Sequence, residues 1–341
     1  MESLRVSTPR TLLRECRDAG AKAEHAVRVG KHLWEGALLL AGRRGHARVL
    51  VLTITERERD AVRAEFGAHH AVTTPARGLA CWTPDEPDDN QFGVIVSQAM
   101  GRSNMPAEQS VQKLVEDWRP EVLVVVGTAG GIARPGADGV LEGPSTGDII
   151  CVEYVHYAAF AKYDSGRRYL RYFPMQHPDN FLITSDVRHV ETSLDWHEGL
   201  MTPPSGETTP PRVRVGELVS LEVVAGDSRA PGQQDLLKDF DHAIAVDMES
   251  GGVARAMHTA SDTVYYRPAW LAIRGVSDLT GDTATVQDLL AGNNEERAQW
   301  TPYAAAAAAR FAHRLVERIL ARGREPFDDP GARSWTPVPQ R

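Results

Sequence analysis

The chain has 341 residues, of which 42% are hydrophobic, and its formal net charge at pH 7 is −8. This length and composition allow one large α/β domain or two ordinary domains, each with a buried core. The negative charge gives no electrostatic reason to expect a nucleic acid or an anionic membrane as a partner.

The cysteines and the apolar runs indicate the compartment. Cys16, Cys81 and Cys151 lie far apart and form no CxxC pair. This usage predicts neither a disulfide framework nor a cysteine zinc site, and it is typical of the reducing cytoplasm. Residues 1–14 are charged and contain no hydrophobic leader, and no apolar run approaches the roughly 20 residues that a membrane helix needs. We therefore expect a cytoplasmic protein.

Apolar periodicity predicts the secondary structure in chain order. Residues 1–45 are expected to form an N-terminal helical extension, because apolar residues recur there at helical spacing. Continuous apolar runs predict strands buried on both faces, near residues 48–54, 92–97, 121–126, 147–153, 213–224, 243–247 and 269–274. Helices are predicted from residue 55, up to residue 118, over 233–240, over 250–257 and, with Thr301 as N-cap and Pro302 as first residue, up to about residue 322.

Residues 154–212 interrupt this pattern with an irregular segment in which aromatic and basic side chains alternate. We interpret it as an elaboration of the core domain, either a solvated connection or a lid that forms one wall of a pocket. The tail, residues 323–341, contains Pro and Arg and is predicted to be flexible.

Two predicted strands each lead to a carboxylate. The run 243–247 precedes Glu249, and the run 269–274 precedes Ser277 and Asp278. Ligands bind at the carboxyl ends of strands in open α/β sheets, so polar residues there are candidates for function. Glu58 follows the first predicted strand, although an acid in the first turn of a helix is also a common cap.

The turn predicted over residues 127–132 is rich in glycine, which lets backbone N–H groups approach a ligand closely. It matches neither the dinucleotide fingerprint nor the Walker loop, and the sequence has no metal-ligand cluster, so no cofactor or metal is expected. Carboxylates without a metal suit cleavage of an N-glycosidic bond. One activates water, one protonates the leaving base, one accepts from vicinal hydroxyls, and their charge stabilises an oxocarbenium-like transition state.

The order of the motifs makes this hypothesis more specific. The sequence resembles the nucleoside phosphorylase superfamily, and most of all its methylthioadenosine/S-adenosylhomocysteine nucleosidases and related purine nucleosidases. The resemblance covers roughly residues 49–322, with a poor match over 154–212. It rests on Glu58 after a strand, Met100-Gly101 before a helix, Val126 to Gly131, Gly147 to Ile150, Val246 to Glu249, Ile273 to Asp278 and the closing helix from Trp300 to Ala305.

The resemblance implies a three-layer α/β/α fold around a mixed, twisted sheet, a catalytic domain over 46–322, a purine nucleoside or nucleotide as ligand and a homo-oligomer. It implies that Asp278 protonates purine N7, that Glu249 holds the ribose hydroxyls and that Glu58 activates water. The Asp at position 278 resembles the residue found at this place in family members that act on 6-aminopurines. The other implied substrate-binding or orienting positions are Met248 under the ribose, Thr128 near the nucleophile, Ser277 and Arg274 as orienting residues of the Asp278 loop, Gly130 and Val224.

The sequence favours water over phosphate as the nucleophile. Phosphorolytic bacterial relatives usually carry an arginine where this chain has Val125, and a glycine-and-arginine loop where it has Thr53 to Glu56. A carboxylate at Glu58 suits water and repels phosphate, whereas Arg102 can reach an anion. Phosphorolysis therefore stays an alternative.

The 5′ substituent also stays open. Methylthioadenosine enzymes have an apolar 5′ pocket, whereas the segment 154–212 offers cations that can hold a 5′-phosphate, namely Lys162, Arg167, Arg168 and Arg171. We expect hydrolysis of an adenine nucleoside. The alternatives are an adenine-nucleotide-cleaving enzyme of the defence-effector type, a purine nucleoside phosphorylase and a non-catalytic nucleoside-binding module.

Overall fold

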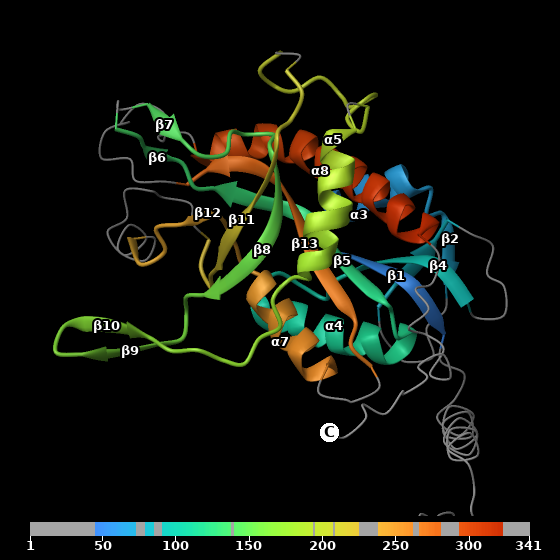
Figure 1. Cartoon of the computed structure of the whole chain (residues 1–341), viewed down its shortest axis with the longest axis horizontal. Coiled ribbons are helices and arrows are strands. Elements are labelled where there is room, and N and C mark those ends of the chain that lie inside the picture. Colours follow the sequence, from blue (N-terminus) through green and yellow to red (C-terminus); the bar gives the residue numbers. More distant parts are fainter. Residues whose placement is uncertain are drawn as a thin grey trace, which may run out of the picture. The chain divides into compact units, whose positions relative to one another are not determined.

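A nine-stranded sheet organises the described part of the chain (Figure 1). The computed structural model describes residues 45–72, 79–84, 91–137, 140–193, 195–206, 209–224, 238–261, 266–280 and 293–322. The predicted extension over 1–45 except Gly45, most of the predicted helix over 233–240 and the tail over 323–341 lie outside these residues and stay predictions.

The sheet contains both parallel and antiparallel pairs. In sheet order its strands are β12 (Ala243–Asp247), β11 (Val213–Ser220), β8 (Ile149–Tyr157), β13 (Ala269–Leu279), β5 (Val122–Gly131), β1 (His46–Thr53), β4 (Gln91–Gln98), β3 (Cys81–Thr83) and β2 (His70–Val72). The pairs among β4, β1, β5 and β13 are parallel, whereas β8 lies antiparallel to β13. β12 pairs with β11 and also with β5, so β5, β13, β8, β11 and β12 close a ring of paired strands.

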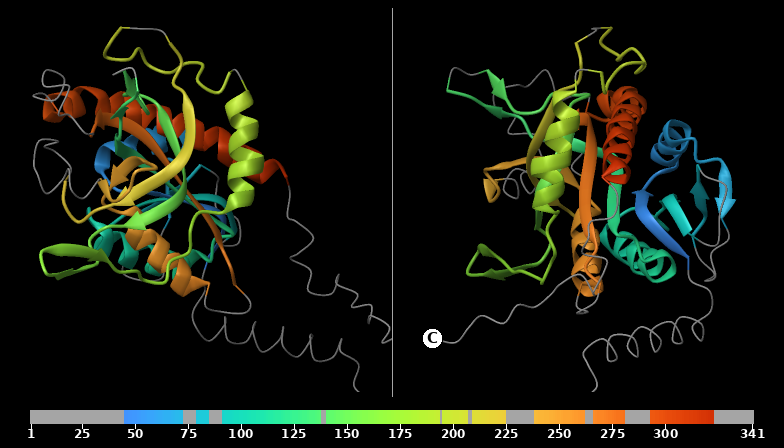
Figure 2. Two further views of the ribbon diagram at one scale, coloured as in Figure 1. Left: turned by 60° about the vertical axis from the view of Figure 1, so that its left-hand side comes forward. Right: turned by 45° about the vertical axis from the view of Figure 1, so that its right-hand side comes forward.

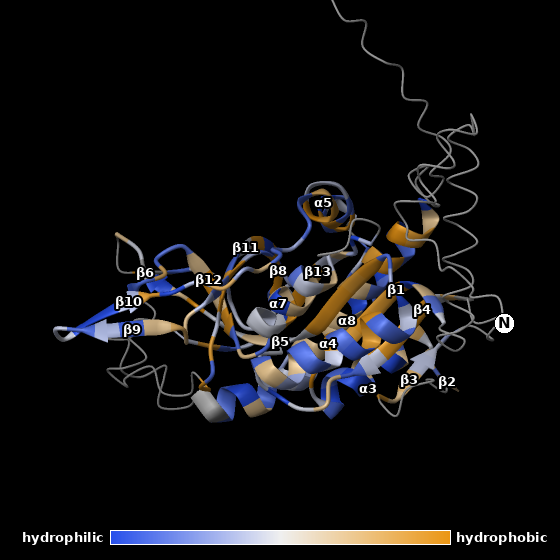
Figure 3. Cartoon of the chain, turned by 90° about the horizontal axis from the view of Figure 1, so that it is seen from below, coloured by the Kyte–Doolittle hydropathy of each residue, from blue (hydrophilic) through white to orange (hydrophobic). Residues whose placement is uncertain are grey.

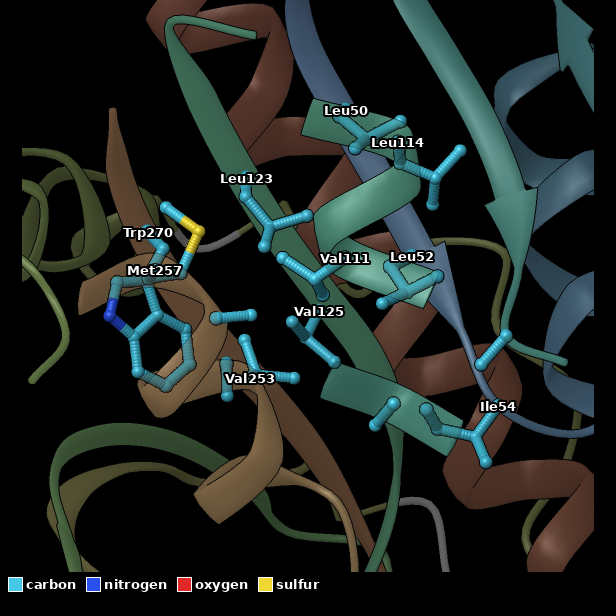
Figure 4. Packing of buried hydrophobic residues seen from close by; sticks show 14 of the residues in the cluster. Leu50, Leu52, Ile54, Val111, Leu114, Leu123, Val125, Val253, Met257 and Trp270 are labelled. Carbon is cyan, nitrogen blue, oxygen red and sulfur yellow. The ribbon is translucent and has the colours of Figure 1, made fainter. Parts of the chain in front are cut away.

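Helices cover both faces of the sheet, which confirms the three-layer architecture (Figure 2). They are α4 (Asn104–Trp118) and α7 (Ser250–Ala260) on one face, and α3 (Glu56–Phe66) and α8 (Asn293–Ala321) on the other. Leu50 and Leu52 of β1 belong to the first core, where Figure 4 shows Leu114 of α4 beside Leu50. Val49 and Val51 belong to the second core, because successive side chains of a strand alternate between faces.

The core strands are far more apolar than the helices around them, whose outer surfaces are hydrophilic (Figure 3). Full burial of one leucine or valine in these layers contributes about 1.5–3 kcal/mol. Within the described ranges, no helix combines the length and the apolar composition that are needed to cross a bilayer.

Two glycines let helices approach their neighbours very closely. A Cβ atom on Gly252 of α7 would collide with the backbone of Asn104, and one on Gly275 of β13 would collide with the backbone of Ala304. Glycine therefore allows α7 to lie against the first turn of α4 and α8 to lie directly on β13.

The last helix begins earlier than predicted. α8 starts at Asn293 and contains Pro302, so the prediction of Thr301 as N-cap is wrong. The Thr301 hydroxyl instead donates to the carbonyl oxygen of Arg297, at 2.5 Å. A proline removes one helical N–H, and the packing of α8 on β13 and β5 outweighs that loss. The additional turns place Arg297 beside the end of β13.

β5 and β13 extend beyond their predicted ends, and β11 stops short of its predicted end. The segment 127–132, predicted as a turn, is strand up to Gly131, because β13 pairs with it along that length and Val246 of β12 pairs with Gly130. β13 likewise continues to Leu279, so Asp278 belongs to a strand and not to a loop. β11 ends at Ser220, and Val224 follows it outside the strand.

The segment 154–212 is more regular than predicted. Its first residues, up to Tyr157, complete the core strand β8. A hairpin of β9 (Ala161–Asp164) and β10 (Arg167–Leu170) follows, and then a π-helical turn (Leu182–Val187) that continues into α5 (Arg188–Thr192). The π-helical turn and α5 contribute buried apolar side chains to the core on the α8 side, so this part of the segment is core and not a solvated connection.

Candidate active site

A cavity of about 760 Å³ lies at the carboxyl ends of β1, β4, β5, β12 and β13. Eight of the nine site residues expected from the sequence line it, namely Glu58, Thr128, Gly130, Val224, Met248, Glu249, Ser277 and Asp278. The ninth, Arg274, is fully buried behind the wall.

Glu58 is held by four hydrogen bonds. It is the third residue of α3 and forms a capping box with Thr55, whose N–H donates to Oε2 at 2.8 Å. The N–H of Ile54 donates to the same oxygen at 3.3 Å. On the other side, Thr128 donates to Oε1 through its N–H at 2.7 Å and its hydroxyl at 2.9 Å. Glu58 thus caps helix α3 and also faces the cavity, so a capping role does not exclude a functional one.

Gly127 leaves the space that this arrangement needs. A Cβ atom at this position would lie 2.8 Å from Oε1 of Glu58 and 2.7 Å from Nη1 of Arg274. Both groups therefore occupy the space that a side chain at Gly127 would fill, a carboxylate from α3 and a guanidinium from β13. Any larger residue at 127 would displace one of them.

Arg274 pairs with Asp247 and not with the end of β13, which corrects the expected role of Arg274 in orienting Asp278. Its Nη2 donates to Asp247 Oδ2 at 2.6 Å and to the Ser250 hydroxyl at 3.2 Å. Its Nε and Nη1 are buried and have no hydrogen-bond partner among the described residues. Burial works to lower the pKa of Arg274, but Asp247, Glu249 and Glu58 together raise it, so the residue is a fixed positive charge behind the carboxylates.

Glu249 stands at the N-terminus of α7 and is 8% exposed. Its Oε1 accepts from the N–H of Ser103 at 3.1 Å, and its Oε2 accepts from the N–H of Met248 at 3.3 Å. Burial and the nearby Asp247 raise the pKa of Glu249 to about 7, against the opposing effect of Arg274. This carboxyl group changes charge close to neutral pH.

Ser103 reaches Glu249 from an unusual backbone conformation. Its φ of 90° is rare for a residue other than glycine and is costly without support. The Ser103 hydroxyl donates to Glu222 Oε2 at 2.8 Å, and Tyr157 donates to Oε1 of the same carboxylate at 2.6 Å. Asn104 adds a third bond to Glu222 at 3.2 Å. Glu222 thereby secures the turn that supplies an N–H to Glu249.

Asp278 is held at the other end of the cavity by a charged partner. Arg297 donates to it through Nε at 3.0 Å and through Nη2 at 2.6 Å, one bond to each carboxylate oxygen. The Ser277 hydroxyl donates to Oδ1 at 2.7 Å. Asp278 is 1% exposed, so these contacts largely define its surroundings.

The cations expected at the 5′ side lie elsewhere. None of Lys162, Arg167, Arg168 and Arg171 lines the cavity, and Lys162 and Arg168 instead pair with Asp164 and Asp239. Among the arginines of the described residues, Arg57, Arg102 and Arg297 line the cavity. In the same part of the chain, no group of His, Cys, Asp and Glu side chains has a metal-binding arrangement.

Sequence reasoning missed four residues of the site, namely Ser103, Glu222, Asp247 and Arg297. Asp247 had a local signal, because an Asp three residues before Ser250 at a helix start is a capping pattern, and its carboxylate does accept from the Ser250 N–H. Glu222 and Arg297 had no local signal in the sequence, because Glu222 bonds to Ser103, 119 residues away, and Arg297 bonds to Asp278, 19 residues away.

A family model described as the phosphorylase superfamily matches residues 59–319, which is most of the chain. The chain belongs to the phosphorylase superfamily. The match begins directly after Glu58 and includes the other candidate residues. No curated protein matches this chain.

Solved structures show the same fold at low sequence identity. A methylthioadenosine/S-adenosylhomocysteine nucleosidase from Neisseria meningitidis, in complex with methylthio-immucillin-A, is 17% identical with a TM-score of 0.57, and the alignment covers 79% of this chain and 98% of that one. The Helicobacter pylori nucleosidase is 13% identical with a TM-score of 0.59 and coverages of 81% and 100%. Futalosine hydrolase of Helicobacter pylori is 13% identical with a TM-score of 0.58 and coverages of 80% and 98%.

Proposed function

We propose that this superfamily member is a purine nucleosidase that hydrolyses the N-glycosidic bond of an adenine nucleoside to free base and sugar. One observation carries the proposal: Glu58, Glu249 and Asp278 come from three separate elements and line one cavity. Structural relatives with the same fold are nucleosidases, and one from Colwellia psychrerythraea contains adenine.

Glu58 and Thr128 form the nucleophile end. Water donates to the Glu58 carboxylate, its oxygen bonds to C1′, and the proton that it loses passes to Glu58. Of the four donors to Glu58, the Thr128 hydroxyl is the one that can rotate about its side chain, so it gives way to the water. The Thr128 N–H and the capping box keep the carboxylate in place during this exchange.

Glu249 forms the ribose end. A carboxylate accepts hydrogen bonds from two vicinal hydroxyls, which orients the sugar over Met248. As the bond to the base breaks, C1′ and the ring oxygen gain positive charge. The ionised carboxylates nearby stabilise this charge because the cavity wall has a low dielectric constant.

Asp278 and Arg297 form the base end. The electron pair of the C1′–N9 bond moves onto the base, and N7 takes up the proton of the Asp278 carboxylic acid, which becomes a carboxylate beside Arg297. The Arg297 guanidinium, 2.6 Å from Asp278, adds positive charge where the base gains electron density. Arg297 is 30% exposed, so it can move when a base enters.

Product analysis tests this proposal. The protein is incubated with methylthioadenosine, S-adenosylhomocysteine, adenosine, inosine and AMP, with and without phosphate, and free base is quantified by liquid chromatography. We expect adenine without phosphate, and a rate about 10²–10⁴-fold lower in Asp278→Asn, which cannot donate the same proton. Release only with phosphate would show a phosphorylase. Binding of nucleosides without any release would show a non-catalytic module.

A further inference from the structure

Glu222 does not line the cavity, but it joins three side chains beside it. It follows β11 and is exposed. Its carboxylate accepts from the Tyr157 hydroxyl at the end of β8, and from Ser103 and Asn104 at the start of α4. Hydrogen bonds of an exposed carboxylate add little to folding, because water competes for the same oxygen atoms. Three ordered donors around such a group therefore indicate a role other than stability.

Ser103 is the strained residue of this cluster. Its φ of 90° and ψ of 159° lie in a region that is adopted almost only by glycine. A serine at an N-cap ordinarily accepts a hydrogen bond from the first turn of its helix. The Ser103 side chain makes no such bond to α4, all of which is described, and donates to Glu222 at 2.8 Å. The bond to Glu222 thus takes the place of a helix cap.

The strained conformation directs the Ser103 N–H at Glu249. This N–H donates to Oε1 of Glu249 at 3.1 Å. Burial raises the pKa of Glu249, as do Asp247 and Glu58. Arg274 and the Ser103 N–H lower the same pKa. The Ser103 N–H therefore favours the ionised carboxylate, which only accepts and so suits two donating hydroxyls.

Glu222 is itself fixed by its other two donors. Tyr157 donates to Oε1 at 2.6 Å, and Asn104 donates to the same oxygen at 3.2 Å. Burial and the contact with Glu222 raise the pKa of Tyr157 to about 12, so the hydroxyl stays a donor at neutral pH. Asn104 is held in turn, because its Oδ1 accepts from the Gly252 N–H at 2.8 Å and from the Ser220 hydroxyl at 2.9 Å. The sheet and α7 therefore fix the position of Glu222.

We infer that Glu222 is a positioning residue that makes the cavity selective for ribose, because through Ser103 it holds Glu249 in the orientation that accepts from the 2′- and 3′-hydroxyls. The inference rests on the proposed function and assigns sugar selectivity to a residue outside the cavity. Misplacement of a positioned group by about 1 Å can lower a rate by about 10²-fold. Loss of Glu222 should weaken recognition of the hydroxyls and spare Asp278 and Glu58, which have other partners.

Substrates that differ only in the sugar hydroxyls test this role. Adenosine has both hydroxyls, and 2′,3′-dideoxyadenosine has neither. In Glu222→Ala, kcat/KM for adenosine should fall about ten-fold or more. The value for dideoxyadenosine should change less than about two-fold, because this compound offers Glu249 no hydroxyl. Equal losses for both compounds would overturn the inference, since they would show a general loosening of the site.

Glu217→Ala is the matched control. Glu217 lies on β11, does not line the cavity, and is likewise bonded to a side chain of β8, His156, at 2.8 Å. Its removal should leave kcat/KM for adenosine and dideoxyadenosine within about two-fold of the native values. A loss of ribose selectivity as large as that in Glu222→Ala would contradict a specific role of Glu222.

A second variant tests whether Glu222 acts through Ser103. Glycine adopts a φ of 90° without strain, so in Ser103→Gly the turn no longer depends on Glu222. Addition of Glu222→Ala to Ser103→Gly should then lower kcat/KM for adenosine less than about two-fold, against about ten-fold in the native background. Equal losses in both backgrounds would overturn the inference, because Glu222 would then act independently of Ser103.

Binding separates this inference from the proposed function. If the protein releases no base, or cleaves one compound too slowly to measure, calorimetric titration of adenosine and dideoxyadenosine still measures recognition of the hydroxyls. Tighter binding of adenosine that is lost in Glu222→Ala and kept in Glu217→Ala supports the positioning role even where catalysis has failed. Equal affinity of the native protein for both compounds, or no affinity for either, overturns it.

Discussion

The two ends of the cavity hold their carboxylates with different kinds of partner. Glu58 and Glu249 accept directly from neutral donors, mostly backbone N–H groups. Asp278 accepts from a guanidinium on both oxygens. Neutral donors fix a carboxylate without cancelling its charge, whereas Arg297 compensates the charge at Asp278. In the proposed mechanism, negative charge therefore stays where the sugar cation would develop, and positive charge lies where the base would leave.

The largest effect should come from Glu58→Gln at the neutral-donor end. Glutamine still completes a capping box with Thr55, so the helix keeps its cap. It cannot take a proton from water, and kcat should fall about 10²–10⁴-fold in steady-state assays of base release. The matched control is Glu56→Gln, two residues earlier and exposed, which should change kcat less than about two-fold. Equal small losses in both variants would mean that Glu58 is only a cap.

A smaller effect should follow from Arg297→Gln at the charged end. This change removes the compensating charge beside Asp278, and kcat should fall about ten-fold with the loss of a charge-assisted contact. Arg314→Gln, on the same helix and paired with Glu317 on the surface, is the control. An unchanged rate in Arg297→Gln would show that the ion pair does not contribute to base departure and would remove the distinction between the two ends.

The smallest effect concerns the pH dependence of stability. The pKa of Glu249 is about 7 in the folded protein and near the ordinary 4.5 when unfolded, so the folded state binds more protons between these values. The free energy of unfolding should therefore fall as pH rises from about 4.5 to about 7, by at most about 1.4 kcal/mol per pH unit. Urea titrations compare native protein with Glu249→Gln, in which the contribution of Glu249 to the pH dependence of unfolding is absent. Parallel pH profiles would contradict the raised pKa.

The same group should shape activity. Glu249 accepts two hydroxyls only when it is ionised, so substrate binding should strengthen as pH rises through about 7. Stability and binding should thus change in opposite directions across one titration, as expected of a residue that contributes to substrate binding at the expense of stability.

Features that depend on local sequence could be predicted. The alternation of apolar strands and helices, the capping position of Glu58 and the carboxylates at the ends of β12 and β13 are all encoded in short windows. The start of α8 was not predictable, because Pro302 resembles a first helical residue, whereas the turns before it contact the end of β13 through Glu296 and Arg297.

Features that depend on tertiary pairing could not be predicted. Strand character at Gly127 to Gly131 arises from pairing with β13 and β12, since glycines alone favour a turn. The partner of Arg274 depends on which buried carboxylate lies nearest in space, and that is Asp247. The insert cations were placed at the 5′ side from composition alone, whereas the arginines that line the cavity among the described residues are Arg57, Arg102 and Arg297.

The most direct test of the central claim follows the oxygen atom of the nucleophile. Adenosine or AMP is cleaved in water enriched in oxygen-18, with inorganic phosphate present. The mass of the sugar product is then measured by mass spectrometry. We predict that the label appears in the released sugar, that no sugar 1-phosphate forms, and that labelled sugar forms about 10²–10⁴-fold more slowly in Glu58→Gln. A sugar 1-phosphate without label would contradict the account, because phosphate and not water would then be the nucleophile beside Glu58.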